Sequence, residues 1–322
     1  MTQSTTTTPL DVLILAGGLS HERDISIRSG RRVAEALRSA GLTANVSDVD
    51  PGLLASLRST RPDVVWPLLH GSTGEDGSIR DLLELVGVRY VGTDPAGSRI
   101  AWNKPVAKTL MARAGAATPE FATLPQSLFR EAGAHTVLGA VLDRLGLPLV
   151  VKPAQGGSAL GVSLVTEADQ LPQAMVACFS YGDVALIERA ISGTEVAVSV
   201  VDLGTGPQVL PVVEIATDGA YDYDARYNAG RTEYFVPARL SPETTRAAGD
   251  LALLAHEQLG LAHISRTDMI VDSAGTPWFL EVNVAPGMTE TSLLPQAADA
   301  SAHPPAELYA SIATEAARSQ RS

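Results

Sequence analysis

The first third of the chain alternates short apolar runs with amphipathic segments. The runs Asp11–Ala16 and Asp63–Leu69 have the length of buried strands, and each is followed by a turn that contains glycine. The segments Ile25–Ala40 and Ile79–Val86 carry apolar residues at helical spacing and are each followed by glycine. This alternation predicts an open parallel α/β sheet whose ligands gather at the carboxyl ends of the strands.

A second unit begins near Gly92 and is richer in turns. Its pattern predicts a helix over Ile100–Ala114, then a strand over Leu149–Lys152 and a returning strand over Val162–Val165. The glycine-rich stretch Gly156–Gly161 lies between these two strands, so we expect a hairpin with a glycine-rich tip.

Strand-like runs dominate the last part of the chain, and one long helix over Pro242–Leu259 interrupts them. The segment Asp218–Thr232 is rich in Gly, Tyr and Asp without a clear period, which is typical of a functional loop. The tail Ala302–Ser322 predicts a surface helix followed by disorder. The predicted strands are Val184–Glu188, Val196–Val201, Val209–Ile215, Met269–Val271 and Trp278–Val282.

Length and charge narrow the classes of function. A chain of 322 residues fits two or three packed domains, and a net charge of −12 argues against nucleic acid as the main partner. The N-terminal Met1–Pro9 is polar, and no apolar run reaches membrane-spanning length, so we expect a cytoplasmic protein without a membrane partner. The single cysteine, Cys178, lies in an apolar run and is expected to be a buried, inert thiol.

Lysine is unusually rare in this chain. Of the 24 lysines and arginines only Lys104, Lys108 and Lys152 are lysines, so each is a candidate for chemistry that needs a compact ammonium group. An ordinary surface position is the alternative for each of them.

The strongest local signal for chemistry lies near the C-terminus. Asp268 precedes a predicted strand, whereas Glu281 and Asn283 are two residues apart on another strand and therefore share a face. Two carboxylates and an amide oxygen form a hard oxygen site suited to magnesium. Arg266 shares the side of Asp268 and is placed to offset charge on a phosphate or an oxyanion. Acidic residues at a solvent-facing strand edge are the alternative.

The glycine-rich loop is the second signal. Backbone N–H groups of glycines can approach phosphates closely, and Ser158 adds a hydroxyl. Lys152 ends the strand before this loop, and Lys104 lies in a separate helical segment, so both are candidates for phosphate contacts. Glu188 and Glu195 are candidates for accepting hydrogen bonds from an adenine amine and from ribose hydroxyls, with exposed turn glutamates as the alternative.

The first unit contributes two further motifs. Glu22 lies in Ser20–Arg23, where a helix is predicted to begin after Gly17-Gly18, and its alternative is a first-turn acid favoured by the helix dipole. His70 ends a strand ahead of the glycine- and acid-rich turn Gly71–Gly77, an arrangement expected close to a ligand, with a helix-capping turn as the alternative.

Together these motifs resemble the D-alanine–D-alanine ligases of the ATP-grasp superfamily, over about Asp11 to Ala300. The matching motifs, in order, are Gly17-Gly18-x-Ser20-x-Glu22-Arg23, His70-Gly71-x-x-Gly74-Glu75-Asp76-Gly77, Lys104, Lys152-Pro153, Gly157-Ser158-x-x-Gly161, Tyr221-Asp222-Tyr223-x-Ala225-x-Tyr227, Arg266-x-Asp268, Glu281-x-Asn283-x-x-Pro286-Gly287-Met288-Thr289 and Ser292-Leu293.

The resemblance implies a three-domain ATP-grasp fold with ATP between the last two domains. The implied domains are an N-terminal open parallel α/β domain (residues 1–92), a central ATP-grasp subdomain (93–187) and a C-terminal α+β ATP-grasp domain (188–322). It also implies an ADP-forming carbon–nitrogen ligase that makes D-alanyl-D-alanine for peptidoglycan through an acyl phosphate. The implied partners are D-alanine, ATP, two Mg²⁺ ions (or Mn²⁺) and a second copy of the chain in a homodimer.

The resemblance further assigns roles to individual residues. In catalysis and substrate anchoring it implies Glu22, Ser158, Tyr227, Arg266 and Gly287. In substrate binding it implies His70, Ser292 and Leu293. In ATP binding it implies Lys104, Lys152, Gly157, Ser158, Glu188, Glu195 and Arg226. As metal ligands it implies Asp268, Glu281 and Asn283, with Glu281 bridging both ions.

Some positions depart from the family pattern. Gly156 replaces a common glutamate, Ala159 a usual serine, Ala190 a larger residue and Arg226 a lysine. These departures leave two alternatives open: a related ligase with a different amino-acid acceptor, serving antibiotic biosynthesis or self-resistance, and a nucleotide-binding regulator without turnover.

Overall fold

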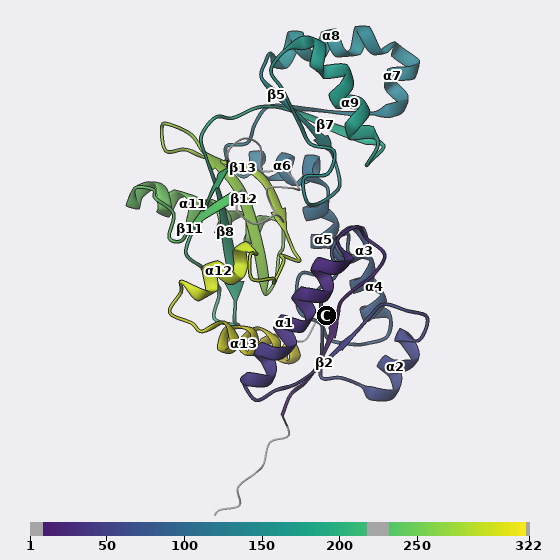
Figure 1. The fold of residues 1–322 in the computed structure, drawn as a ribbon, viewed down its shortest axis with the longest axis vertical. Helices are drawn as coiled ribbons and strands as arrows, with labels where there is room; N and C mark the ends of the chain where they lie inside the picture. Colours follow the sequence, from purple (N-terminus) through teal and green to yellow (C-terminus); the bar gives the residue numbers. More distant parts are fainter. Residues whose placement is uncertain (1–8, 218–231, 320–322) are drawn as a thin grey trace, which may run out of the picture.

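The computed structural model describes residues 9–217 and 232–319. Its strands form three sheets, which Figure 1 shows as successive lobes along the long axis of the molecule. The three-stranded sheet lies at the bottom of that view, the six-stranded sheet in the middle and the four-stranded sheet at the top. The expected α/β class is confirmed.

The first sheet is parallel, as predicted, with β1 between β2 and β3; its strands are β1 (Asp11–Leu15), β2 (Thr43–Ser47) and β3 (Val64–Pro67). Val12 and Ile14 of the central strand are fully buried, as in a strand with neighbours on both sides. Its helices are α1 (Arg23–Ser39), α2 (Leu53–Thr60), α3 (Ser72–Glu75) and α4 (Ser78–Leu85). Because α1 and α3 start directly after β1 and β3, Glu22 and His70 both lie at the carboxyl edge of the sheet.

The second sheet is antiparallel in the order β4-β7-β5-β6. Its strands are β4 (Phe121–Pro125), β5 (Leu149–Pro153), β6 (Ser163–Val165) and β7 (Val184–Arg189). β5 and β6 pair with Leu149 opposite Val165, which confirms the predicted hairpin around the glycine-rich loop. The covering helices are α7 (Gln126–Ala132), α8 (Ala134–Leu145), the 3₁₀ turn η1 (Ala168–Gln170) and α9 (Leu171–Phe179).

The third sheet has the order β11-β10-β8-β12-β13, with β9 also paired to β8. Its strands are β8 (Thr194–Asp202), β9 (Pro207–Val209), β10 (Val213–Thr217), β11 (Thr232–Phe235), β12 (Ile264–Val271) and β13 (Pro277–Asn283). The long helix α11 (Pro242–Gln258) confirms the predicted one, and its Ser241 cap accepts the N–H of Thr244 at 3.2 Å. Two helices follow the sheet, α12 (Leu293–Asp299) and α13 (Pro305–Arg318).

The single helix predicted over Ile100–Ala114 is wrong. Two helices, α5 (Pro95–Trp102) and α6 (Lys104–Arg113), meet at Asn103, whose side chain accepts the N–H of Val106 and caps α6. Pro105 fits the first turn of a new helix but not the interior of a longer one. Lys104 is therefore the first residue of α6.

Two strand predictions also need correction. The run Val209–Ile215 is divided between β9 and β10, because Pro211 between them has no N–H for a sheet ladder. The prediction Met269–Val271 is too short, since β12 begins at Ile264 and its polar residues are paired with both β8 and β13.

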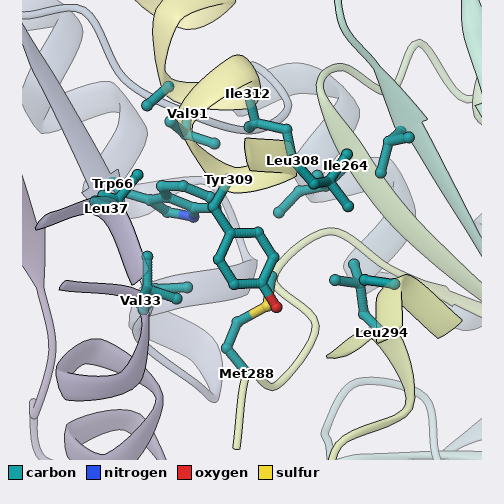
Figure 2. Close-up of a cluster of buried hydrophobic side chains, with 14 of the residues drawn as sticks. Val33, Leu37, Trp66, Val91, Ile264, Met288, Leu294, Leu308, Tyr309 and Ile312 are labelled. Atoms are coloured by element: carbon teal, nitrogen blue, oxygen red, sulfur yellow. The ribbon is translucent and has the colours of Figure 1, made fainter. Parts of the chain in front are cut away.

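The C-terminal helix is part of the core, and the prediction of a surface helix is wrong. α13 lies against α1 and β3, and its Leu308, Tyr309 and Ile312 are buried. Figure 2 shows Tyr309 beside Trp66 of β3, and their ring centroids are 6.0 Å apart with the rings nearly perpendicular. Across the described residues, every helix is too short or too polar to span a bilayer.

Candidate active site

A pocket lies where the first sheet, the glycine-rich loop and the β12–β13 pair meet. Its walls are built from residues that are far apart in sequence but were predicted to act together. The predicted site residues that line it are Glu22, His70, Lys104, Gly157, Ser158, Arg266, Glu281, Asn283, Gly287, Ser292 and Leu293. We call this cavity the substrate pocket.

Glu22 is a buried carboxylate on the first-sheet side of the pocket. It precedes α1, is 8% exposed and accepts a short hydrogen bond from the hydroxyl of Ser158. Ser158 has φ of 51°, a left-handed conformation that is uncommon outside glycine and is often found at functional sites. A Cβ at Gly157 would lie 3.4 Å from the Glu22 carboxylate, which shows how closely the loop approaches this side chain.

His70 and Glu75 form the back of the same pocket. Burial lowers the pKa of His70, and its Nε2 is a buried atom without a hydrogen-bond partner among the described residues. Glu75 accepts the N–H of Gly71 at 2.9 Å, and burial together with the nearby Glu22 raises its pKa to about 8. The pKa shifts of Glu75 and His70, which both line the pocket, thus favour the uncharged form of each side chain.

The predicted metal ligands share one face of the β12–β13 pair. Asp268 is directly opposite Glu281 in the ladder, and Arg266 is directly opposite Asn283. Residues that are opposite or two apart on antiparallel strands point to the same side, so all four side chains converge. Arg266 donates to both oxygens of Asp268 at 2.6 and 2.8 Å. In the described ranges no three His, Cys, Asp or Glu side chains cluster as a metal site, so the candidate set depends on the Asn283 amide.

Lys104 joins the two sides of the site. Its ammonium donates to the carbonyl of Gly156 at 2.6 Å and lies 3.3 Å from the carboxylate of Glu281. It is therefore positioned between the glycine-rich loop and the β13 carboxylate.

A second, larger pocket opens on the other side of Lys104, between the four-stranded and six-stranded sheets. Its volume is about 340 Å³ against about 80 Å³ for the substrate pocket. The two pockets share Lys104, Gly156, Gly157 and Glu281. We call it the nucleotide pocket after the ligand predicted from the sequence, and the further predicted residues that line it are Lys152, Glu188, Glu195 and Asp268.

Three charged side chains are buried together at one wall of the nucleotide pocket. Glu188 lies 2.6 Å from the ammonium of Lys152 and 2.9 Å from that of Lys108. Burial alone would raise the pKa of Glu188, but Lys152 and Lys108 hold it below its ordinary value. Burial lowers the pKa of Lys108 to about 8, although Glu188 opposes this. Burial also opposes the charged form of Lys152, but Glu188 and Glu281 raise its pKa above the ordinary value.

The segment after β13 forms the far wall of the substrate pocket. Its backbone is held by side chains: the N–H of Met288 donates to Ser29 of α1 at 3.1 Å, and the N–H of Thr289 donates to Ser292 at 3.0 Å. A Cβ at Gly287 would lie 2.8 Å from the Ser292 hydroxyl, so a larger residue would displace this wall. Leu293 is buried at the start of α12.

Comparison with known proteins connects this geometry to a family. The family model described as D-ala D-ala ligase C-terminus matches residues 110–314, and that described as D-ala D-ala ligase N-terminus matches residues 45–93. A D-alanine–D-alanine ligase from Bordetella petrii is 39% identical over 305 residues, which cover 94% of this chain and 91% of the relative. The chain belongs to the D-alanine–D-alanine ligase family.

Other members of the D-alanine–D-alanine ligase family agree in sequence and in fold. A D-alanine–D-alanine ligase from Anaeromyxobacter sp. is 41% identical over 288 residues, which cover 89% of this chain and 90% of the relative. The crystal structure of a D-alanine–D-alanine ligase from Bacillus anthracis complexed with ATP has a TM-score of 0.79 at 29% identity, over 97% of this chain and 98% of that one. A D-Ala:D-Ser ligase from Enterococcus faecalis reaches a TM-score of 0.81 at 23% identity, over 96% of this chain and 100% of that one, and this likeness concerns the fold alone. The ATP-grasp fold and the ligase class of enzyme predicted from the sequence are confirmed.

The structure brings together every predicted site residue that it describes. Tyr227 and Arg226 lie outside the described residues, so their predicted roles stay predictions. The sequence did not assign Glu75, Lys108 or Ser29 to the site, although Glu75 lies in a motif shared with the D-alanine–D-alanine ligases. The rarity of lysine was the available signal for Lys108, whereas Ser29 gave none beyond its place on the predicted helix.

Proposed function

We propose that this ligase joins two D-alanines into D-alanyl-D-alanine and converts ATP to ADP and phosphate, as a step in making peptidoglycan precursors. One observation carries the proposal: a polar pocket of amino-acid size and a larger pocket meet at a single wall formed by Lys104, Glu281 and the glycine-rich loop. A phosphoryl group held at that wall would face a substrate carboxylate on one side and the rest of a nucleotide on the other.

The nucleotide is proposed to fill the larger pocket. Val150, Leu164 and Ile270 supply apolar surface for the adenine ring, while Glu188 and Glu195 are acceptors for its amine and for the ribose. Lys104, Lys152 and the N–H groups of Gly157 and Ser158 are suited to the phosphates, and Arg226 is proposed to join them.

Magnesium fits the donor set on the β12–β13 face. Asp268, Glu281 and Asn283 would hold one or two ions through hard oxygen ligands, and the ions would offset the charge of the transferring phosphoryl group. The carboxylates are at present compensated by Arg266 and Lys104, so cations are already favoured at this position. Arg266, which now donates to both oxygens of Asp268, would share that carboxylate with a bound ion and would also lie close to the reacting carbonyl.

The amino acids are proposed to bind in the smaller pocket. Glu22 would hold the ammonium of the first D-alanine, with Ser158 and Tyr227 fixing the carboxylate of Glu22 through hydrogen bonds. The Nε2 of His70, which has no hydrogen-bond partner within residues 9–217 and 232–319, is available to this substrate. Ser292 and Leu293 would seat the carboxylate and the methyl group of the second D-alanine.

The chemistry proceeds in two transfers. An oxygen of the first D-alanine's carboxylate attacks the γ-phosphorus of ATP, and the bond between this phosphorus and the β,γ-bridging oxygen breaks. ADP departs, and the first D-alanine is now an acyl phosphate. The amine of the second D-alanine then attacks the acyl carbon and phosphate departs, while Arg266 and the N–H of Gly287 stabilise the oxyanion. The acyl phosphate hydrolyses readily, so water has to be excluded from it. The glycine-rich loop that closes over Glu22 is placed to exclude water.

Product analysis tests the proposal. The enzyme would be incubated with ATP, magnesium and D-alanine, D-serine or D-lactate as acceptor, and products would be measured by mass spectrometry with ADP release. D-Alanyl-D-alanine should dominate at pH 7. A dominant product with another acceptor would replace the proposed substrate but keep the ligase, whereas nucleotide binding without ADP release would leave only a regulator.

The cellular setting and domain division extend the proposal. We place the enzyme in the cytoplasm as a homodimer without a nucleic-acid partner, in accord with its net charge of −12, and divide it at residues 92 and 187. Light scattering coupled to gel filtration would test the dimer, and a monomeric mass at micromolar concentration would contradict it.

A further inference from the structure

Lys108 is the most deeply buried charge beside the nucleotide pocket, yet it does not line that pocket. Its side chain is 0% exposed, whereas Glu188 and Lys152, its neighbours in the cluster, both line the wall. Lys108 therefore does not touch a nucleotide in this pocket directly, and its closest link to the pocket lining is its ion pair with Glu188.

The cluster contains one positive charge more than its carboxylate needs. Glu188 and Lys152 lie on one face of the second sheet, because Glu188 is opposite Val150 and Lys152 is two residues from Val150. Lys108 approaches the same carboxylate from α6 and binds its other oxygen. A single buried carboxylate with two ammonium partners can lose one of them and remain paired.

The two lysines differ in what else holds them. Lys108 is anchored on its far side, where its ammonium lies 3.3 Å from the carbonyl of Phe279 and 5.8 Å from the centre of the Phe121 ring. Thr118 donates to the same Phe279 carbonyl at 3.0 Å, which fixes that acceptor. Lys152, in contrast, faces the pocket next to the glycine-rich loop, where phosphates are proposed to bind.

We propose that Lys108 is a positioning residue for nucleotide recognition: it is the permanent counter-ion of Glu188, which allows Lys152 to turn from Glu188 to the phosphates while Glu188 stays ionised and fixed as the acceptor for the adenine amine. The inference rests on the proposed binding of ATP in this pocket. It explains why two of the three lysines in the chain share one carboxylate.

The test is a double-mutant cycle on nucleotide affinity. Dissociation constants for ATP and for ITP, which lacks the exocyclic amine, would be measured by calorimetry for the full-length enzyme and for Lys108→Met, Lys108→Arg, Glu188→Gln and Lys108→Met/Glu188→Gln. Lys108→Met should weaken ATP binding about tenfold and reduce the preference for ATP over ITP. Lys108→Arg should restore at least part of both, because the charge is kept.

The matched control is Thr118→Val, which removes a hydrogen bond to the same Phe279 carbonyl but leaves the counter-ion in place. It should change ATP affinity and base preference less than twofold. In the Glu188→Gln background, Lys108→Met should have almost no further effect, because its route to the nucleotide is already cut.

Three results would overturn the inference: unchanged ATP affinity in folded Lys108→Met, an equal loss in Thr118→Val, or a full tenfold loss on adding Lys108→Met to Glu188→Gln. If Lys108→Met alone does not fold, Lys108→Gln, which keeps a polar side chain beside Glu188 but removes the charge, takes its place in the cycle, and unchanged ATP affinity in that variant would overturn the inference. Failure of the unmodified enzyme to bind ATP would instead contradict the proposed function.

Discussion

The two pockets of this enzyme are built in opposite ways. The nucleotide pocket is lined by residues 104–281, largely from two facing sheets, and combines apolar side chains with one compensated charge cluster. The substrate pocket is a quarter of that size or less and takes its walls from Glu22 to Leu293, nearly the whole length of the chain. Under the proposed assignment, recognition of the nucleotide involves two of the lobes, whereas recognition of the amino acids involves all three.

The shared wall gives the largest expected effect. Glu281→Gln should lower kcat about 10²–10³-fold while ATP affinity changes less than about threefold, because the carboxylate serves phosphoryl transfer and other residues hold the adenosine. Steady-state kinetics and calorimetry would be compared with Glu257→Gln, an exposed change on α11. Near-normal turnover of a folded Glu281→Gln would reject the metal and phosphate assignment of this wall.

A change in the substrate pocket alone should alter the KM for D-alanine and leave the KM for ATP unchanged. Ser292→Ala removes the acceptor for Thr289 N–H and should raise the KM for the second D-alanine about tenfold, through two hydrogen bonds of about 0.5–1.5 kcal/mol each. The KM for ATP should not move. Ser301→Ala, whose hydroxyl bonds only near the end of α12, is the control, and equal effects of both variants on D-alanine would contradict the assignment.

The opposite pattern of KM changes is expected for a substitution in the nucleotide pocket. Leu164→Ala should raise the KM for ATP about fivefold, about 1 kcal/mol of lost apolar contact, and leave the KM for D-alanine unchanged. Leu164 is 56% exposed in the pocket wall, so the change should cost little stability. Leu85→Ala on α4 removes a more exposed leucine, 83% exposed, away from both pockets and should change neither KM. A rise in the KM for D-alanine with Leu164→Ala would contradict the separate roles of the two pockets.

The smallest effect concerns stability and pH. The pKa of Glu75 is raised to about 8 in the folded enzyme, so the folded state binds a proton that the unfolded state loses near pH 4–5. The resulting stability is complete below that range and is lost as pH rises through about 8. Glu75→Gln should remove this loss. Between pH 6 and 9 the free energy of unfolding should therefore fall less in the variant than in the unmodified enzyme, and the two falls should differ by on the order of 1 kcal/mol. Urea unfolding at both pH values measures this, and parallel pH profiles would contradict it.

The sequence predicted best those features that depend on neighbouring residues. The strands around Val12 and Leu149, the helix α11 and the glycine-rich hairpin followed from local periodicity and turn chemistry. The site residues followed from family motifs rather than from geometry, because pairing such as Asp268 opposite Glu281 needs the register of two strands.

The remaining features depend on contacts between distant segments. Lys108 resembles a surface lysine in sequence, and only the approach of α6 to β7 and β13 buries it beside Glu188. In the same way, Leu308 and Tyr309 lie in an ordinary amphipathic segment of the sequence, and only the packing of α13 against the first sheet shows that they are buried. Tertiary burial of this kind has no local signature, since the partner lies 80 residues away for Lys108 and Glu188 and 243 residues away for Tyr309 and Trp66.

The contact between Trp66 and Tyr309 has a consequence for biosynthesis. A ribosome makes the strands of the first sheet early and the helix that covers them almost last, with more than two hundred residues between the two rings. At a translation rate of ~5–20 residues per second, Tyr309 is synthesised on the order of ten seconds or longer after Trp66. During that interval the nascent chain exposes an apolar surface that chaperones can bind. The substrate pocket, whose lining extends to Leu293, cannot be completed until synthesis is nearly over.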